Sequence, residues 1–218
     1  MCESNQSQKH GFTWENDIRE NIFGLPKQKN DRNVHDIPSE KNKYNDLENV
    51  SIKTTGSETI CCGDIIRFYS YDFSKKNTVM VIKYKQSGDN KIIDHIYEID
   101  YNQKCHEHLF GNLPKEEIVS YVNEVNKIPQ NIKGKDAKAI FSYLEKKKEL
   151  SKKYSFNISI NPKVDSSQSR VQCSITKFIK TLKDFIIYKS PDENTNMVRE
   201  KEISSSITSK KRERKSKN

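Results

Sequence analysis

The sequence predicts an α/β fold with a central mixed β-sheet flanked by helices. Two observations support this class: β-branched and aromatic residues are concentrated between residues 50 and 101, and segments with apolar residues at helical spacing stand on either side of that block. A chain of 218 residues, 33% of them hydrophobic, is long enough for one domain with a buried core. We therefore expect a disordered N-terminus over residues 1–9, a single domain over 10–189 and a disordered basic tail over 190–218.

The first predicted element is a helix. In "GFTWENDIRENIFGLP" the apolar residues Trp14, Ile18 and Ile22 recur at helical spacing, and Gly24 and Pro26 end the pattern. The polar segment that follows, residues 27–49, is rich in Asn, Asp and Lys and is predicted to be a loop.

Four strands are predicted next, from runs of β-branched and aromatic residues at 50–55, 59–72, 77–86 and 91–101. The sequence "SGDN", Ser87 to Asn90, separates the last two. Because Gly88 tolerates a positive φ, these two strands are expected to form a hairpin.

The second half of the chain mixes helices and strands. One helix is predicted after Pro114, a residue suited to a first helical position, and another from about Asp136. Two further strands are predicted at 156–160 and 169–175, and helical spacing returns in "SITKFIKTLKDFIIYK". Beyond Ser190 this periodicity is lost, and the terminal "SKKRERKSKN" has the composition of a nuclear-localisation signal, a DNA tether or a solubilising tail.

The charge balance favours an anionic partner. Lys and Arg number 39 against 30 Asp and Glu, a formal net charge of +9, which favours nucleic acid, although biased codon usage also produces Lys-rich and Asn-rich chains. The chain has no apolar leader and no run of roughly 20 apolar residues that would cross a bilayer. Five cysteines without a CxxC pair fit a reducing compartment, so we expect an intracellular protein, cytoplasmic or nuclear, with no membrane partner.

Asp36 and Lys53 form the candidate catalytic pair. Phosphodiester hydrolysis needs a divalent cation, a group that positions water and a positive charge for the transition state. Magnesium prefers oxygen ligands such as carboxylates and backbone carbonyls. Asp36, an isolated aspartate on a polar loop, supplies a carboxylate for the metal, and Lys53, at a strand end, supplies a positive charge.

The arrangement resembles the PD-(D/E)XK pattern of type II restriction endonucleases: an acidic residue on the first helix, an isolated Asp, a gap of moderate length and a strand ending in x-x-Lys. The matching positions are Glu15, Asp36, Ser51 and Lys53. The resemblance implies a restriction-endonuclease-like core over about residues 10–110, bound Mg²⁺, cleavage of double-stranded DNA at a short sequence, and a homodimer that cuts both strands.

The resemblance also implies a role for each residue. Asp36 binds the metal and Lys53 positions the attacking water, while Ser51 and the carbonyl of Ile52 flank the metal. Two departures stand out: His35 replaces the proline before Asp36, and neutral Ser51 replaces the second acid. Asp64, as a further metal ligand, or Glu15 then supplies the missing charge, with Glu58 and Glu48 as weaker substitutes.

A second stretch, "INPKVDSSQSRVQCSI", holds the candidate DNA-reading residues. Arg bonds guanine through two donors and Gln bonds adenine in the same way, so Lys163, Arg170 and Gln172 are expected to contact bases or phosphates over about residues 155–175. Charged residues of a solvated loop are the structural alternative. Two other functions compete with the nuclease: a non-catalytic DNA-binding protein that keeps the fold, and a structural component that binds protein or RNA.

Overall fold

The computed structural model describes residues 13–27, 34–129, 143–164 and 170–208. Two compact units make up the chain: unit 1 draws on residues 1–57, 75–100 and 186–218, and unit 2 on 58–74 and 101–185. Both units contain residues from the range 10–189 that the sequence analysis treated as a single domain. Each unit has its own sheet and its own helices, and the predicted α/β class is confirmed.

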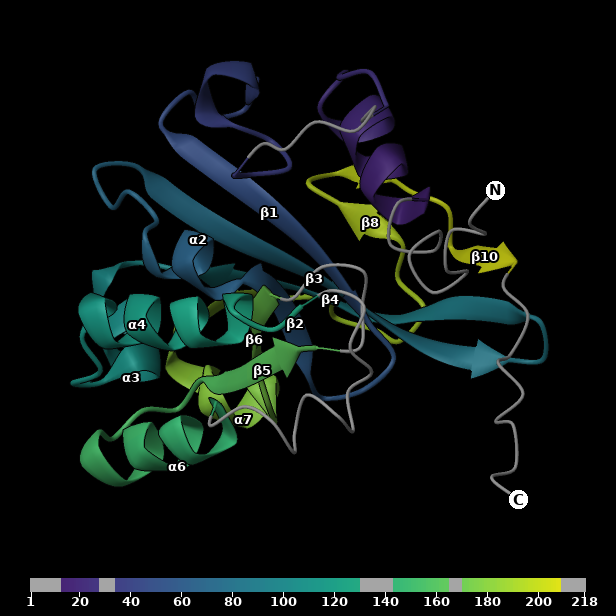
Figure 1. Ribbon diagram of the computed structural model, residues 1–218. Coiled ribbons are helices and arrows are strands. Elements are labelled where there is room, and N and C mark those ends of the chain that lie inside the picture. Colours follow the sequence, from purple (N-terminus) through teal and green to yellow (C-terminus); the bar gives the residue numbers. More distant parts are fainter. Residues whose placement is uncertain (1–12, 28–33, 130–142, 165–169, 209–218) are drawn as a thin grey trace. The chain divides into compact units, whose positions relative to one another are not determined.

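Unit 1 is built on a mixed five-stranded sheet. Its strands run in the order β1-β3-β4-β10, and β7 also pairs with β4. The pair β1–β3 is parallel, whereas β4 is antiparallel to β3, to β7 and to β10. Figure 1 shows β1 at one border of this twisted sheet. The bounds are β1 (Glu48–Thr55), β3 (Lys76–Ser87), β4 (Asn90–Asp100), β7 (Ile186–Lys189) and β10 (Ser206–Thr208).

The predicted strands of this sheet and its hairpin are confirmed. The turn between β3 and β4 pairs Ser87 with Asn90 and places Gly88 at φ 56°. The helical element of unit 1 covers residues 13–22 and ends in the π-helical turn η1 (Ile18–Ile22). Its apolar side packs into the core of the sheet, and the short 3-10 turn η2 (Ser39–Lys41) contacts β1. The cluster contains Trp14, Ile18, Ile22, Val50, Ile52, Met80 and Ile82, among others.

The expectation of a disordered tail from residue 190 is wrong for residues 190–208. These residues contain β8 (Met197–Val198), β9 (Lys201–Glu202) and β10, and they bury Val198, Ile203 and Ile207. Three apolar residues separated by polar ones give no helical or strand period, so the sequence pattern missed them. The terminal basic run 209–218 and the N-terminus 1–9 lie outside the described residues.

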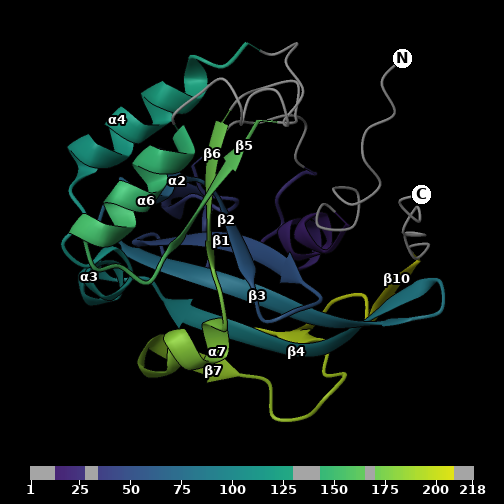
Figure 2. The ribbon, with the colours of Figure 1, turned by 60° about the horizontal axis from the view of Figure 1, so that its bottom comes forward.

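Unit 2 pairs a three-stranded antiparallel sheet, in the order β2-β6-β5, with helices. Helix α2 contacts β2 and β6, and α4 packs beside both α2 and α6, as Figure 2 shows for α4 and α6. The strands are β2 (Ile60–Asp64), β5 (Ser159–Lys163) and β6 (Arg170–Ile175). The helices are α2 (Ile65–Tyr69), α3 (Gln103–Phe110), α4 (Lys115–Asn126), α6 (Tyr143–Lys153), α7 (Phe178–Thr181) and the 3-10 turn η3 (Lys183–Phe185).

Two segments differ from their predicted structure. The strand expected over 59–72 ends at Asp64, because the Asp64 carboxylate accepts a hydrogen bond from the Arg67 amide and begins α2. The helix expected over 174–189 is limited to α7 and η3, and the chain then enters β7 by pairing with β4. Helix α3 was not predicted, and Asp136 lies outside the described residues. No helix in the described ranges is long and apolar enough to cross a membrane.

Candidate active site

The segment around Asp36 is attached to the edge strand β1. Ile37 forms an isolated antiparallel bridge with Val50: the amide of Ile37 donates to the Val50 carbonyl at 2.9 Å, and the amide of Val50 donates to the Ile37 carbonyl at 2.8 Å. Oδ2 of Asp36 accepts a hydrogen bond from the amide of Ile52 at 2.6 Å. The polar loop therefore folds back on β1 and holds the Asp36 carboxylate at the edge of the strand.

Asp36 and Lys53 are brought together as the sequence predicted. Nζ of Lys53 lies 3.5 Å from Oδ2 of Asp36, and the two side chains are 22% and 20% exposed. A pair with this partial exposure is accessible to a ligand and is less screened by water than a surface pair. The carboxylate and the ammonium thus share one partly desolvated position.

The carbonyl of Ile52 lies on the same edge of β1 as Asp36. In a strand, the N–H and C=O of one residue point in the same direction, and this direction alternates between successive residues. Val50 uses both groups on Ile37, and the Ile52 amide bonds Asp36. The Ile52 carbonyl therefore faces the edge that carries the Asp36 carboxylate.

Glu15 belongs to the same electrostatic group. Burial, followed by repulsion from Asp36, raises the pKa of Glu15 to about 7, and the charges of Lys53 and Arg19 oppose this rise. Glu15, the acid of the first helix, therefore interacts electrostatically with the Asp36–Lys53 pair. A partly buried carboxyl group whose pKa is raised by burial and by a neighbouring charge is a feature of many functional sites.

Ser51 and His35 occupy the two positions where the chain departs from the family pattern. Oγ of Ser51 shares a hydrogen bond with Nδ1 of His35 at 3.3 Å, and Ser51 is only 1% exposed. Burial lowers the pKa of His35 to about 4, against the opposing effect of Asp36, so the imidazole is neutral at pH 7. A buried, neutral hydroxyl therefore stands where the PD-(D/E)XK pattern has its second acid.

Arg19 is a residue of the site that sequence reasoning missed. Its guanidinium donates to the backbone carbonyls of Asp36 and, at 3.2 Å, Pro26, and the residue is 4% exposed. An arginine in the middle of the otherwise apolar buried side of a helix was the available signal, because a buried guanidinium requires partners.

Glu48 and Asp64, two of the other acids considered as substitutes, have structural roles. Both oxygens of Glu48 accept hydrogen bonds from the guanidinium of Arg199, at 2.8 and 3.0 Å, and Oε1 also accepts from Thr78. Asp64 belongs to unit 2 and caps α2, and Glu58 also lies in unit 2.

Within the described ranges no group of three or more His, Cys, Asp or Glu side chains is arranged to hold a metal. The Asp36 carboxylate and the Ile52 carbonyl are oxygen donors of the kind preferred by an ion such as Mg²⁺, which retains several waters.

The predicted DNA-reading residues gather on one sheet of unit 2. Lys163 of β5 is directly opposite Arg170 of β6, and both are exposed. Gln172, two residues further along β6, is on the same face as Arg170. It pairs with Asn161 of β5 on one side and with Asp64 of β2 on the other. Two cationic side chains therefore lie opposite each other on neighbouring strands.

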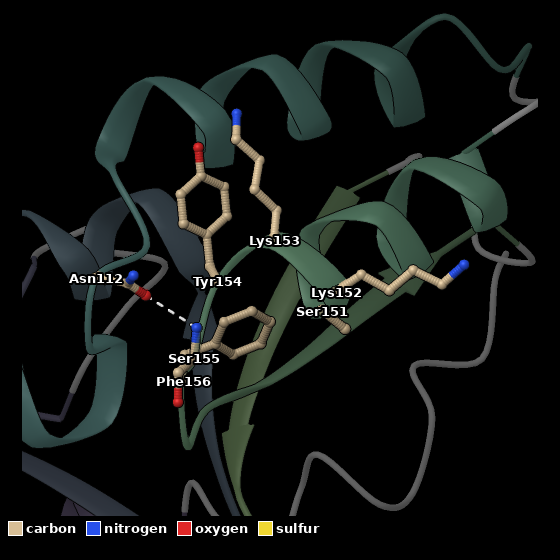
Figure 3. A pocket seen from close by; sticks show the side chains of 7 residues that line it. All are labelled: Asn112, Ser151, Lys152, Lys153, Tyr154, Ser155 and Phe156. Atoms are coloured by element: carbon tan, nitrogen blue, oxygen red, sulfur yellow. Dashed lines mark hydrogen bonds between the residues drawn. The ribbon is translucent and has the colours of Figure 1, made fainter.

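Unit 2 also contains a polar depression of about 510 Å³ at the C-terminal end of α6. It has no carboxylate in its lining, and Nζ of Lys153 and the hydroxyl of Tyr154 each donate to Glu117 at 2.9 Å. Figure 3 shows the amines of Lys152 and Lys153 pointing away from each other. The lining lacks convergent catalytic groups; it consists of Asn112, Ser151, Lys152, Lys153, Tyr154, Ser155 and Phe156.

Comparison with known proteins identifies no relative. No protein family model matches the chain, no curated protein matches it, and no solved structure matches it. The geometry of the described residues therefore carries the functional argument.

Proposed function

We propose that this protein is a Mg²⁺-dependent endonuclease that cleaves double-stranded DNA at a specific sequence, similar to the type II restriction enzymes. The observation that carries the proposal is the contact between Asp36 and Lys53, with the Ile52 amide fixing the carboxylate. The PD-(D/E)XK pattern requires an acid and a lysine from separate segments to meet at the edge of a strand, and here they do.

The residues divide the task by their chemistry. Asp36, the Ile52 carbonyl and Glu15 are the oxygen donors that would hold Mg²⁺. The bound ion would stabilise negative charge on the scissile phosphate and lower the pKa of a bound water. Lys53, within 3.5 Å of Asp36, orients the attacking water and stabilises charge on the phosphoryl oxygens. Glu15 supplies the charge absent at Ser51: burial, followed by repulsion from Asp36, raises its pKa, and a bound cation would relieve the repulsive part.

The β5–β6 face of unit 2 is the proposed DNA contact. Lys163 and Arg170 neutralise phosphates, and Gln172 has an amide that pairs with an adenine edge. The net charge of +9 adds a sequence-independent attraction. A homodimer follows from the same proposal, because two copies related by a two-fold axis cut both strands of a palindrome.

A plasmid-cleavage assay with Mg²⁺ or Mn²⁺ tests the proposal. We expect discrete fragments with the native protein, and none with Asp36→Asn or after removal of the metal with a chelator. The matched control is Glu193→Gln, an exposed acid of unit 1 whose partner is Lys85. Smearing or intact plasmid in every lane would contradict the proposal.

The second candidate is a DNA-binding protein without nuclease activity. The neutral Ser51–His35 pair favours it, because the second acid of the family pattern is absent. Under this alternative, DNA is retarded on a gel but not cut, and Asp36→Asn leaves the retardation unchanged.

A further inference from the structure

The segment of residues 35–37 is attached to β1 at three consecutive positions. The side chain of His35 contacts Ser51, the side chain of Asp36 contacts the Ile52 amide, and the backbone of Ile37 pairs with Val50. The first of these contacts is the least expected, because the family pattern assigns metal binding to the position of Ser51.

The burial of Ser51 decides what its hydroxyl can do. A side chain that is 1% exposed is not reachable by a phosphodiester or by a hydrated cation, so the hydroxyl is neither a nucleophile nor an accessible ligand. Its contact with Nδ1 of His35 crosses from β1 to the residue directly before Asp36. A hydrogen bond at this place fixes the backbone from which the Asp36 carboxylate projects.

We propose that His35 and Ser51 act together as a positioning pair, which holds Asp36 in place for the metal and for Lys53. This inference rests on the proposed nuclease function for its consequence, but not for its geometry. At the position of the missing acid, Ser51 therefore does not bind the metal. It orients Asp36 through His35, and Glu15 is the second carboxylate of the site.

The geometry makes the two ring nitrogens of His35 distinguishable. The amide of an asparagine reaches the place of Nδ1, and the amide of a glutamine reaches toward the place of Nε2. If His35 acts through Nδ1 and Ser51, His35→Asn restores what His35→Ala loses, and His35→Gln does not. Ser51→Ala is expected to have the same effect as His35→Ala. The double variant is expected to be no worse than either single variant, because each substitution removes the same His35–Ser51 hydrogen bond.

The first readout is amide hydrogen exchange, measured by NMR on the full chain. In His35→Ala and Ser51→Ala, the exchange of the Ile52 amide is expected to rise by about tenfold or more, while the amides of β3 keep their protection. His95→Ala, on β4 in the same unit, is the control and leaves the Ile52 amide unchanged. A uniform rise at all amides would mean global destabilisation and would overturn the positioning role, as would an unchanged Ile52 amide.

The second readout is Mn²⁺ binding by titration calorimetry, with cleavage measured in parallel. We expect His35→Ala to weaken Mn²⁺ binding by about tenfold, with recovery in His35→Asn, in the range known for groups that support metal ligands. Native protein that neither binds Mn²⁺ nor cuts DNA, yet shows the expected exchange pattern, refutes the nuclease and leaves the positioning pair standing. Normal Mn²⁺ affinity in both His35→Ala and Ser51→Ala refutes the pair.

Discussion

Nζ of Lys53 lies 3.5 Å from Oδ2 of Asp36, across 17 residues of sequence. The contact exists because the polar loop returns to β1, where the Ile37–Val50 bridge and the Ile52 amide fix it. Several measurable consequences depend on this contact and on the charges around it.

Removal of the lysine is expected to affect catalysis more than folding. In Lys53→Ala the cleavage rate should fall by about 10²–10³-fold, the typical cost of one lost transition-state partner. The free energy of unfolding should change by less than about 1 kcal/mol, because a partly exposed ion pair contributes little. Single-turnover cleavage and urea denaturation measure the two effects, with Lys127→Ala, of the exposed Lys127–Glu124 pair, as the control. An equal loss of cleavage rate in Lys127→Ala would contradict a catalytic role for Lys53.

Glu15 should make stability depend on pH near neutrality. Its pKa is raised from 4.5 to about 7, so the protonated form is favoured by the folded state. The stabilisation is present below about pH 4.5 and is lost as pH rises through 7, by roughly 2 kcal/mol after allowance for screening. Glu15→Gln should abolish this slope and be more stable than the native protein at pH 8. Urea unfolding between pH 5 and pH 8 measures both, and an unchanged slope in Glu15→Gln would refute the assignment.

The Glu48–Arg199 pair should be essential to the stability of unit 1. Glu48 is 2% exposed, and Arg199→Met leaves its carboxylate buried with fewer partners, at a cost of about 3–5 kcal/mol. The control is Glu193→Gln, which breaks the Lys85–Glu193 pair, in which both side chains are more than half exposed. Lys85→Met would break the same pair, but it would also remove a partner of Asp94. A loss under 1 kcal/mol for Arg199→Met, measured by denaturant titration, would show that the pair is dispensable.

The same pair predicts acid sensitivity. Burial alone would raise the pKa of Glu48, but hydrogen bonds from Arg199 and Thr78 lower it to about 2 from 4.5. A lowered carboxyl pKa stabilises the folded state above about pH 4.5, and this contribution disappears as pH falls toward 2. Thermal unfolding of native protein and Glu48→Gln over pH 2–6 should therefore show a smaller loss of stability in the variant. Parallel curves would contradict this origin of acid sensitivity.

The residues that we propose contact DNA should differ in their effect on the salt dependence of binding. Lys163→Ala and Arg170→Ala should each reduce the slope of log affinity against log salt by about 1, because each removes one phosphate contact. Gln172→Ala should leave the slope unchanged and alter the preference among DNA sequences. Lys148→Ala, on the exposed side of α6, serves as the matched cation control. Fluorescence anisotropy over a series of salt concentrations measures the slopes, and equal slopes in all four variants would remove the β5–β6 face from the interface.

The sequence alone determined those features that depend on local periodicity. The apolar spacing of Trp14, Ile18 and Ile22 predicted the first helix, and the run of β-branched residues with Gly88 predicted the β3–β4 hairpin. Both are formed by contacts between residues near in sequence, so the period of the apolar residues indicates which side of each element is buried. Asp36 and Lys53 were identified differently, by their residue types and by their resemblance to the PD-(D/E)XK pattern.

Only the tertiary structure decided the partners of these residues. The parallel pairing of β1 with β3, the return of the loop to β1 and the attachment of Arg199 to Glu48 join residues between 13 and 151 positions apart. No local period encodes such pairings, because they result from competition among all surfaces that must be buried together. For the same reason the sequence did not show that the Ser51 hydroxyl, at the position where an acid was expected, shares a hydrogen bond with His35, 16 residues away.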